Sequence, residues 1–233
     1  RETMRANLLR AMSHDIRTPL TSIVGNTAAI LDNEDSFSPE QKRRLLEDVN
    51  EDAQWLIRMV ENLLSITRMS DGQAKIEKEC EAAEEIVAVS VSKFTKRFPN
   101  IQVTVEVPDE VLMVPMDATL IRQVMMNLLE NAAKFAAPGS TLYLGLTETG
   151  GDKAVVTVRN TGHTIPAEEI PLLFERFHKS DKSRSEDKDG YGLGLYVVKT
   201  ILSQHKEKIT VTSENGVTSF SFTVQLAHPM RNT

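Results

Sequence analysis

The sequence predicts two domains of different class, an all-α hairpin over residues 1–71 and an α/β sandwich over residues 72–233. Up to residue 71, apolar residues recur at steps of three and four, the period of an amphipathic helix. After Gly72, short alternating segments typical of strands lie between helical patterns. We therefore expect a helical hairpin, followed by a mixed, mainly antiparallel sheet backed by helices.

The composition is typical of a globular protein in a reducing compartment. Hydrophobic residues make up 40% of the 233 residues and charged residues 26%, which is too apolar for general disorder. A net charge of -6 would repel a phosphate backbone, so no nucleic acid is expected as a partner. The single cysteine, Cys80, cannot form an intrachain disulfide, and no apolar stretch approaches the ~20 residues of a membrane helix. We expect a cytoplasmic location, and because the chain begins at Arg1, any membrane segments would lie outside it.

Two long helices are expected in the first domain. The first covers residues 1–32 and ends at a polar turn. The second begins with Ser38 as N-cap, Pro39 at the first helical position and Gln41 as the capping-box partner, and it stops at Gly72. A lone hairpin leaves an apolar stripe on each helix, so we expect two copies to pair into a four-helix bundle. The alternative is that the second domain covers these stripes.

The second domain shows strand and helix signals in turn. Asp117 is placed to cap a helix that runs to about residue 135, and another helix is expected over residues 193–204. Gly150-Gly151 marks a hairpin turn, and residues 161–190 form a loop-rich stretch. Strands are predicted at residues 101–105, 111–116, 142–147, 154–158, 209–211 and 220–224.

His14, in the first helix, has the neighbours of a reactive histidine. A neutral imidazole is a competent nucleophile near pH 7, because its unperturbed pKa is ~6.5. Asp15 can accept its proton, and Thr18 lies one turn away on the same face. Pro19 clashes with the carbonyl of Asp15, so the helix is expected to kink or loosen there. The alternative is an exposed histidine without a role, which these neighbours disfavour.

The segment SHDIRTPL, residues 13–20, resembles the H box of sensor histidine kinases, and later segments resemble the other boxes of that family in the same order. The resemblance implies a Bergerat-type, GHKL-like fold that binds ATP and Mg²⁺, and a homodimer formed through the hairpin. It implies autophosphorylation of His14 with Asp15 as general base, then transfer to an aspartate in a response regulator receiver domain. It also implies a phosphatase reaction in which Thr18 orients water.

Residues 127–135 resemble the N box of the family. Asn127, Asn131 and Lys134 are spaced so that one helical face presents two amides and an ammonium. Amide oxygens suit Mg²⁺, which prefers oxygen ligands. The resemblance implies that Asn127 binds nucleotide, Asn131 ligates the metal, Lys134 contacts phosphate and Phe135 lies against the nucleotide. By itself, such an amide pair would more often cap a surface.

Residues 159–166 occupy the place of the first glycine box, in which Gly162 and Ile165 match the family pattern. The segment departs from it twice, since Asn160 replaces an aspartate and Thr164 replaces a glycine. An amide can still accept the adenine amino proton, but a neutral acceptor contributes ~0.5–1.5 kcal/mol against ~1.5–3 for a charged one. We therefore predict weakened ATP binding that is not abolished.

Residues 174–177, with the sequence FERF, resemble the F box, and the polar residues 178–189 resemble a mobile lid. Lys182 and Arg184 in this lid are expected to meet phosphates, the alternative being a merely solvated loop. Residues 190–195 resemble a second glycine box, where glycine lets the backbone approach phosphate at a helix start. The nucleotide-binding residues expected in this box are Gly190, Gly192, Leu193, Gly194 and Leu195.

Two other functions remain open from the sequence. One is an ATPase of the gyrase or chaperone type, which shares the ATP fold but lacks a phosphoacceptor, and His14 with its hairpin argues against it. The other is a nucleotide-binding scaffold that dimerises and docks regulators without catalysis, which Asn160 and Thr164 would favour.

Overall fold

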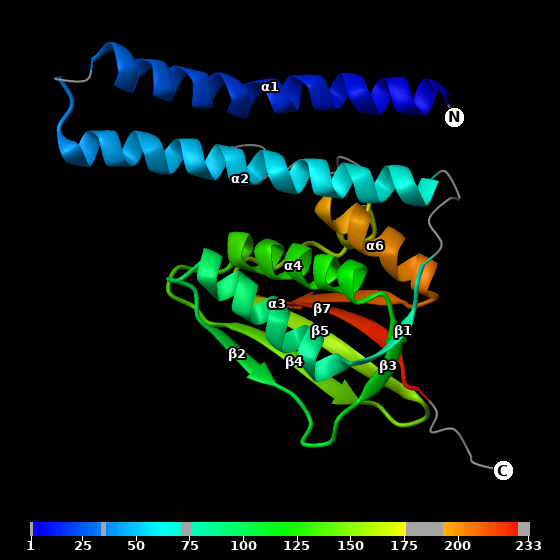
Figure 1. Cartoon of the computed structure of the whole chain (residues 1–233). Helices are drawn as coiled ribbons and strands as arrows, with labels where there is room; N and C mark the ends of the chain where they lie inside the picture. The colour runs from blue at the N-terminus through cyan, green and yellow to red at the C-terminus, as the bar shows by residue number, and fades with distance from the viewer. Residues whose placement is uncertain (1, 34–35, 71–75, 176–192, 228–233) are drawn as a thin grey trace. The chain divides into compact units, whose positions relative to one another are not determined.

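The computed structural model describes the fold of residues 2–33, 36–70, 76–175 and 193–227 (Figure 1). In the two N-terminal helices, side chains are described from Ile16 to Thr67, apart from residues 34–35. The chain divides into two compact units, residues 1–67 and 68–233. The domain boundary predicted after residue 71 falls among residues 71–75, outside the described part of the chain.

The first unit is a hairpin of α1 (Glu2–Asp32) and α2 (Pro39–Ser70), which run antiparallel (Figure 1). The capping box predicted at the start of α2 is confirmed. Ser38 N donates to Gln41 Oε1 at 2.9 Å, and Gln41 N donates to Ser38 Oγ at 3.2 Å. α1 continues through Pro19 as one helix, so the proline does not divide it. None of the described helices is long and apolar enough to cross a membrane.

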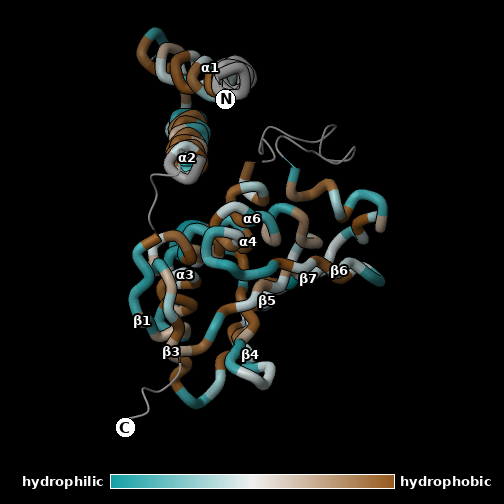
Figure 2. Tube along the Cα trace, turned by 90° about the vertical axis from the view of Figure 1, so that its right-hand side faces the viewer, coloured by the Kyte–Doolittle hydropathy of each residue, from teal (hydrophilic) through white to brown (hydrophobic). Residues whose placement is uncertain are grey.

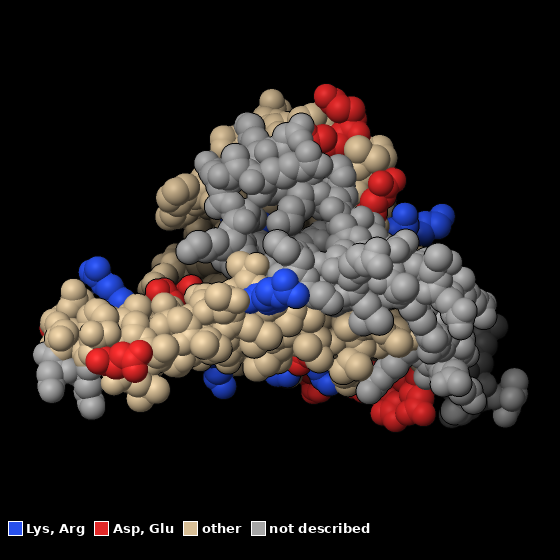
Figure 3. All heavy atoms as spheres, turned by 90° about the horizontal axis from the view of Figure 1, so that it is seen from above, with Lys and Arg blue, Asp and Glu red and all other residues tan. Residues whose placement is uncertain are grey.

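Both hairpin helices expose large apolar side chains. Figure 2, which colours the chain trace by hydropathy, shows hydrophobic and hydrophilic positions mixed along both helices. Between Ile16 and Leu31 of α1, Arg17 is the only charged residue. The space-filling view accordingly shows few charges along this part of α1 (Figure 3). The exposed apolar side chains are Leu20, Val24 and Leu31 on α1, and Leu46, Ile57, Val60 and Leu64 on α2.

The second unit contains a five-stranded sheet with the strand order β2-β4-β5-β7-β6. Only β2 and β4 are parallel, and every other neighbouring pair in this sheet is antiparallel. The mixed, mainly antiparallel sheet is therefore as predicted. The strands of this sheet are β2 (Val103–Glu106), β4 (Leu142–Glu148), β5 (Lys153–Thr161), β6 (Ile209–Glu214) and β7 (Val217–Gln225). A separate antiparallel pair joins β1 (Glu79–Ala82) to β3 (Met113–Met116).

Three helices, α3 (Ala83–Arg97), α4 (Ala118–Phe135) and α6 (Gly194–His205), cover one face of the sheet (Figure 1). A short 3-10 helix, η1 (Ile170–Leu172), precedes the residues that are not described. Alternate strand residues point toward the helices and form a dry core, as the period of two requires. Core residues exposed by 3% or less include Val124, Leu128, Leu142, Leu144, Leu146, Val156, Val158, Ile201, Phe220 and Phe222.

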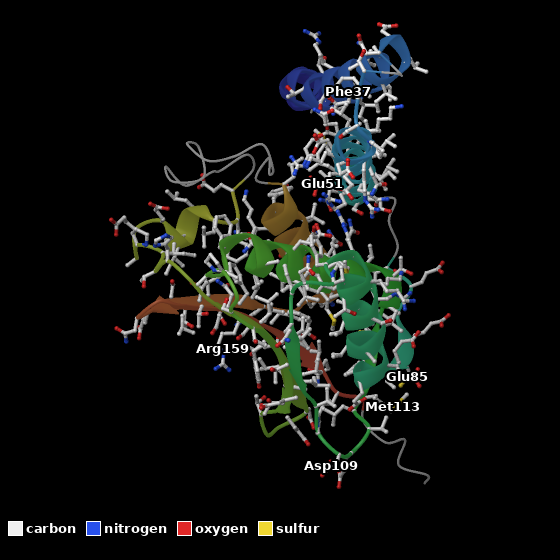
Figure 4. The ribbon with its side chains drawn as sticks, turned by 90° about the vertical axis from the view of Figure 1, so that its left-hand side faces the viewer. Phe37, Glu51, Glu85, Asp109, Met113 and Arg159 are labelled. Atoms are coloured by element: carbon white, nitrogen blue, oxygen red, sulfur yellow. The ribbon has the colours of Figure 1, made fainter. Side chains whose placement is uncertain are left out.

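The opposite face of the sheet is polar. Arg159 lies on this face, away from the helices (Figure 4). Its guanidinium carbon stands 4.3 Å from the centre of the Tyr143 ring, and the Tyr143 hydroxyl donates to Glu106 Oε2 at 2.8 Å. This hydrogen bond to the Glu106 carboxylate raises the pKa of Tyr143 above its ordinary value. Arg159 directly precedes Asn160, but successive side chains of a strand point to opposite faces of the sheet. The Arg159 charge therefore lies on the face opposite to the one that the helices cover.

The sequence patterns missed the helix α3 and the strand β1. In α3, the acidic first turn obscures an apolar face whose residues Ile86, Val87 and Phe94 are buried. β1 has no alternating apolar pattern and depends on pairing with β3. Strands β6 and β7 extend further than predicted, because a tight turn at Asn215 and Gly216, both with positive φ, continues their pairing.

Candidate functional site

α4 carries the predicted N-box residues on a polar face. The Asp117 side chain caps this helix by accepting hydrogen bonds from Thr119 N and Leu120 N, each at 3.1 Å. The buried side of α4 packs into the core, so its remaining positions border the solvent. On that border Asn127 and Asn131 are half-buried, while Lys134 and Phe135 are exposed.

The start of α6 lies beside Asn127. A β-carbon built on Gly194 would stand 3.5 Å from Asn127 Oδ1, so the backbone there approaches the amide closely. Leu193 precedes the helix and is 4% exposed, and Leu195 is half-buried. The first backbone N–H groups of a helix have no partner within it, and they favour anions. The structure thus brings an N-box amide and an anion-favouring helix start together.

The end of β5 meets the end of α4. Gly162 forms an isolated β-bridge with Ala136, and a β-carbon on Gly162 would overlap the carbonyl oxygen of Phe135. Glycine is therefore required at position 162 by this close approach. Asn160 is 3% exposed and points to the helix-covered face, with its Nδ2 atom 3.4 Å from that built β-carbon. The amide predicted to accept from adenine is buried next to α4.

Two aromatic rings lie near these segments. Phe135 is 44% exposed, and the Lys134 ammonium stands 5.2 Å from the centre of its ring. Phe174 packs edge-on against Phe220 of β7, with ring centres 6.4 Å apart, and Lys199 of α6 lies 6.0 Å from the Phe174 ring. The Phe135 ring is therefore accessible to a ligand, whereas Phe174 anchors its segment to the sheet and to α6.

The N box of α4, residues 127–135, presents two neutral amides and one cation. Glu130 is the only carboxylate within residues 127–135, and its Oε1 atom accepts from Arg97 Nη1 of α3 at 2.7 Å. No group of three or more His, Cys, Asp or Glu side chains that could hold a metal occurs in the described part of the chain. Here the protein offers amide oxygens and an ammonium rather than a carboxylate cage.

Two protein families match the two units. Residues 4–72 match the His Kinase A (phospho-acceptor) domain, and residues 116–228 match the Histidine kinase-, DNA gyrase B-, and HSP90-like ATPase family. The chain belongs to the sensor histidine kinases of two-component systems. The second match implies ATP binding, and the first implies dimerisation. A gyrase-type or chaperone-type ATPase is disfavoured, because the phospho-acceptor match covers residues 4–72, nearly the whole hairpin.

Named relatives support the same family. The sensor protein KdpD of Clostridium acetobutylicum is 40% identical over 225 residues, which cover 96% of this chain and 25% of that protein. The probable sensor histidine kinase TcrY of Mycobacterium tuberculosis is 32% identical, with 97% of this chain and 46% of that protein covered. The solved histidine kinase AdeS of Acinetobacter baumannii shares the fold, with a TM-score of 0.67, 20% identity and coverage of 92% and 98%. This kinase chain thus spans a quarter of the length of KdpD and slightly less than half of the length of TcrY.

Other predicted site residues of this kinase core lie on α1 or in the segment between Glu175 and Leu193. His14 and Asp15 lie in α1, but their side chains are outside the described part of the structure, while Thr18 is exposed. Lys182, Arg184, Gly190 and Gly192 also lie outside the described residues. The site described here therefore consists of α4, the end of β5 with its following loop, and the start of α6.

A buried histidine of the kinase, which sequence reasoning missed, joins α4 to α6. His205 is 2% exposed; its Nδ1–H donates to Ile201 O at 2.8 Å, and its Nε2 accepts from Asp117 N at 3.2 Å. The ring is therefore neutral, and burial lowers its pKa below the ordinary value despite the opposing hydrogen bond to Ile201. Lys78 Nζ donates to His205 O at 2.9 Å. The sequence signal that could have identified His205 is its position on an apolar helix face, four residues after Ile201.

Proposed function

We propose that this chain phosphorylates itself on His14 with ATP and then passes the phosphoryl group to an aspartate in a response regulator receiver domain. One observation carries the proposal, namely the approach of the α6 start at Gly194 to the Asn127 amide. The same helix face of α4 also bears Asn131 and Lys134, so phosphate-binding groups of three kinds lie on two adjoining elements. The match to the ATPase family supports ATP as the ligand of these groups.

ATP would occupy the side of the unit where these elements adjoin. Asn160 would accept the adenine amino proton at the buried end, and the exposed Phe135 ring would lie against the base. Gly162 and Ile165 would form the backbone wall beside it. The remaining binding residues of this proposal are Leu193, Gly194 and Leu195 at the start of α6, with Gly190, Gly192, Lys182 and Arg184 from the preceding segment.

The residues present fit Mg²⁺ held mainly by the nucleotide. Mg²⁺ keeps several waters and takes few protein ligands, commonly together with substrate phosphates. Asn131 supplies a half-buried amide oxygen on the α4 face that also carries Lys134, and Glu130 is held by Arg97. Asn131 would therefore hold the metal. When bound, Mg²⁺ would neutralise charge on the phosphates.

At His14, a ring nitrogen would attack the γ-phosphorus as its bond to the bridging oxygen breaks, so that ADP leaves. Asp15 would accept the ring proton released by this attack. In the second step the N–P bond breaks, and the phosphoryl group passes to a carboxylate oxygen of the receiver aspartate. No water is consumed in either transfer, and Glu130, the only carboxylate of the N box, is engaged by Arg97 rather than free to activate water.

The decisive test is incubation of the chain with Mg²⁺ and γ-labelled ATP. Wild type should acquire label that is labile in acid and stable in base, as expected of a phosphohistidine, and His14→Ala should acquire none. His228→Ala, a histidine outside both binding elements, is the matched control and should label normally. Equal labelling of His14→Ala and wild type would overturn the acceptor assignment.

The scaffold alternative has its own test, because Asn160 is its main motivation. ATP titration should show binding by wild type and tighter binding by Asn160→Asp, since a charged acceptor is worth more than a neutral one. Detectable binding by the variant alone, together with absence of label in wild type, would favour a scaffold over a kinase.

We further propose that the kinase is also a phosphatase toward its regulator, with Thr18 orienting the attacking water. Thr18 is exposed on α1, one turn after His14. Thr18→Ala should still acquire label from ATP but should dephosphorylate a receiver domain, previously labelled by the wild-type kinase, more slowly. Full phosphatase activity in Thr18→Ala would contradict this role.

A further inference from the structure

The loop after β5, residues 162–165, is tied to the turn between β6 and β7. Gly162 N donates to Gly216 O at 2.8 Å, and Gly216 N donates back to Thr164 Oγ1 at 2.8 Å. The two segments are in close contact, because a β-carbon on Gly216 would stand 3.1 Å from Gly162 O. The Thr164 hydroxyl thus closes a two-way connection between the loop and the turn.

A buried hydroxyl pair extends this connection into the core. Ile165 N donates to Ser213 Oγ at 2.8 Å, and Ser213 Oγ shares a hydrogen bond with Thr218 Oγ1 at 2.7 Å. Ser213 is 8% exposed and Thr218 is 4% exposed. Thr218 is also the register partner of Asn160 in the pairing of β5 with β7. The β6–β7 hairpin therefore contacts the loop and also pairs with Asn160, the strand residue whose amide is proposed to meet adenine.

Position 164 does not need glycine. Among the described non-glycine residues, positive φ occurs only at Asp152, Lys206 and Asn215, so Thr164 has a backbone conformation open to any L-residue. Gly162 differs, because a side chain there would overlap the Phe135 carbonyl oxygen. Threonine at 164 therefore adds a hydroxyl without backbone strain, and that hydroxyl satisfies the Gly216 N–H.

We propose that Thr164 is a positioning residue for nucleotide binding, whose hydroxyl fixes the 162–165 loop to the β6–β7 turn in the conformation that the nucleotide meets. The inference rests on the proposed ATP site. Glycine at 164 would remove the hydrogen bond and widen the range of backbone conformations in the free protein. Binding would then have to order the loop, which weakens affinity. The departure from the glycine of the family pattern thus supports binding, whereas the sequence alone suggested that it weakens binding.

Calorimetric titration of the full chain with Mg²⁺ and ADP tests the proposal, because ADP allows no phosphoryl transfer from the γ-position. Thr164→Ser keeps the hydroxyl and should bind within about twofold of wild type. Thr164→Val keeps the shape, Thr164→Gly restores the family residue, and both should bind about 2- to 10-fold more weakly, the factor that one net hydrogen bond confers. Thr212→Val, at an exposed threonine of the same hairpin, is the matched control and should bind as wild type does.

Amide exchange of Gly216 in the nucleotide-free protein provides a readout that does not depend on binding. Thr164→Val and Thr164→Gly should exchange this amide faster than wild type, whereas Thr164→Ser and Thr212→Val should not. Affinity in Thr164→Gly equal to or above that of wild type would overturn the proposal. Absence of nucleotide binding by wild type would overturn the proposed ATP site. Separately, unchanged Gly216 exchange in Thr164→Val would overturn the connection between the loop and the turn.

Discussion

Gly162 tolerates no side chain, because its neighbour is a backbone carbonyl, that of Phe135, which cannot rotate aside. Gly162→Ala should lower the free energy of unfolding of the second unit by about 1–3 kcal/mol, the usual cost of overpacking. Gly25, in α1, is the matched control, because a β-carbon there meets nothing within 4 Å. Gly25→Ala should stabilise the hairpin by up to ~1 kcal/mol. Urea denaturation measures both, and wild-type stability in Gly162→Ala would contradict the close approach.

His205 makes the stability of the second unit depend on pH. Its folded-state pKa lies below the ordinary value of 6.5, because burial disfavours the charged ring and Lys78 adds to this. Well above pH 6.5 the ring is neutral in both states, so its full contribution to stability is present. As the pH falls below 6.5, the unfolded chain binds the proton first, and that contribution is progressively lost down to the folded-state pKa.

The urea midpoint of the second unit should therefore drop between about pH 7.5 and about pH 5.5, and it should drop less in His205→Gln. Exposed His163 is the matched control, since it has no comparable burial, and His163→Gln should retain the wild-type slope. An identical slope in His205→Gln and wild type would show that other groups govern this window.

The start of α2 depends on a reciprocal pair of hydrogen bonds between Ser38 and Gln41. Ser38→Ala should lower the free energy of unfolding of the hairpin by about 1 kcal/mol, because it leaves the Gln41 N–H without its cap. Ser36→Ala is the matched control, since Ser36 donates a hydrogen bond to Asn33 O through its backbone N–H, which the substitution keeps. Thermal unfolding followed by helical circular dichroism measures both variants, and equal losses would indicate a general effect of the turn.

Elements with local signals could be predicted from the sequence, and elements that depend on distant pairing could not. The starts of α2 and α4 follow from side chains next to them, Ser38 and Asp117, and both are confirmed. β1 has no such signal, because it exists through pairing with β3. The parallel pairing of β2 with β4 also joins segments far apart in the chain, so no local pattern indicates it.

The site shows the same division. The resemblance selected Asn127 and Gly194 from separate segments, and the structure brings them together, although their roles stay predictions. His205 and Ser213 were missed, because each acts through a contact with a distant segment: His205 with the start of α4, and Ser213 with the loop after β5. In a sequence, a polar residue that the fold buries is hard to distinguish from one that remains exposed to solvent.

The hairpin and the second unit differ in how much apolar surface they bury within one copy of the chain. The second unit buries its strand and helix residues within one copy, for example Leu128 and Phe222 at 0% exposure. The hairpin instead leaves Val24 and Leu31 of α1 64% and 78% exposed. On α2, Leu46, which is 54% exposed, shares a helix face with other exposed apolar residues. A second copy of the hairpin would bury these faces, which agrees with the dimerisation that the phospho-acceptor family implies.

Ile57 lies on the exposed apolar face of α2 and is 52% exposed in one copy. Ile57→Glu should raise the dimer dissociation constant at least about tenfold, because burying an isoleucine is worth ~1.5–3 kcal/mol and a dimer contains two such sites. Sedimentation velocity over a concentration series measures this. Val111→Glu is the matched control, since Val111 is 66% exposed on the second unit and should leave the association unchanged. Undiminished dimerisation of Ile57→Glu would mean that the hairpins pair through another face.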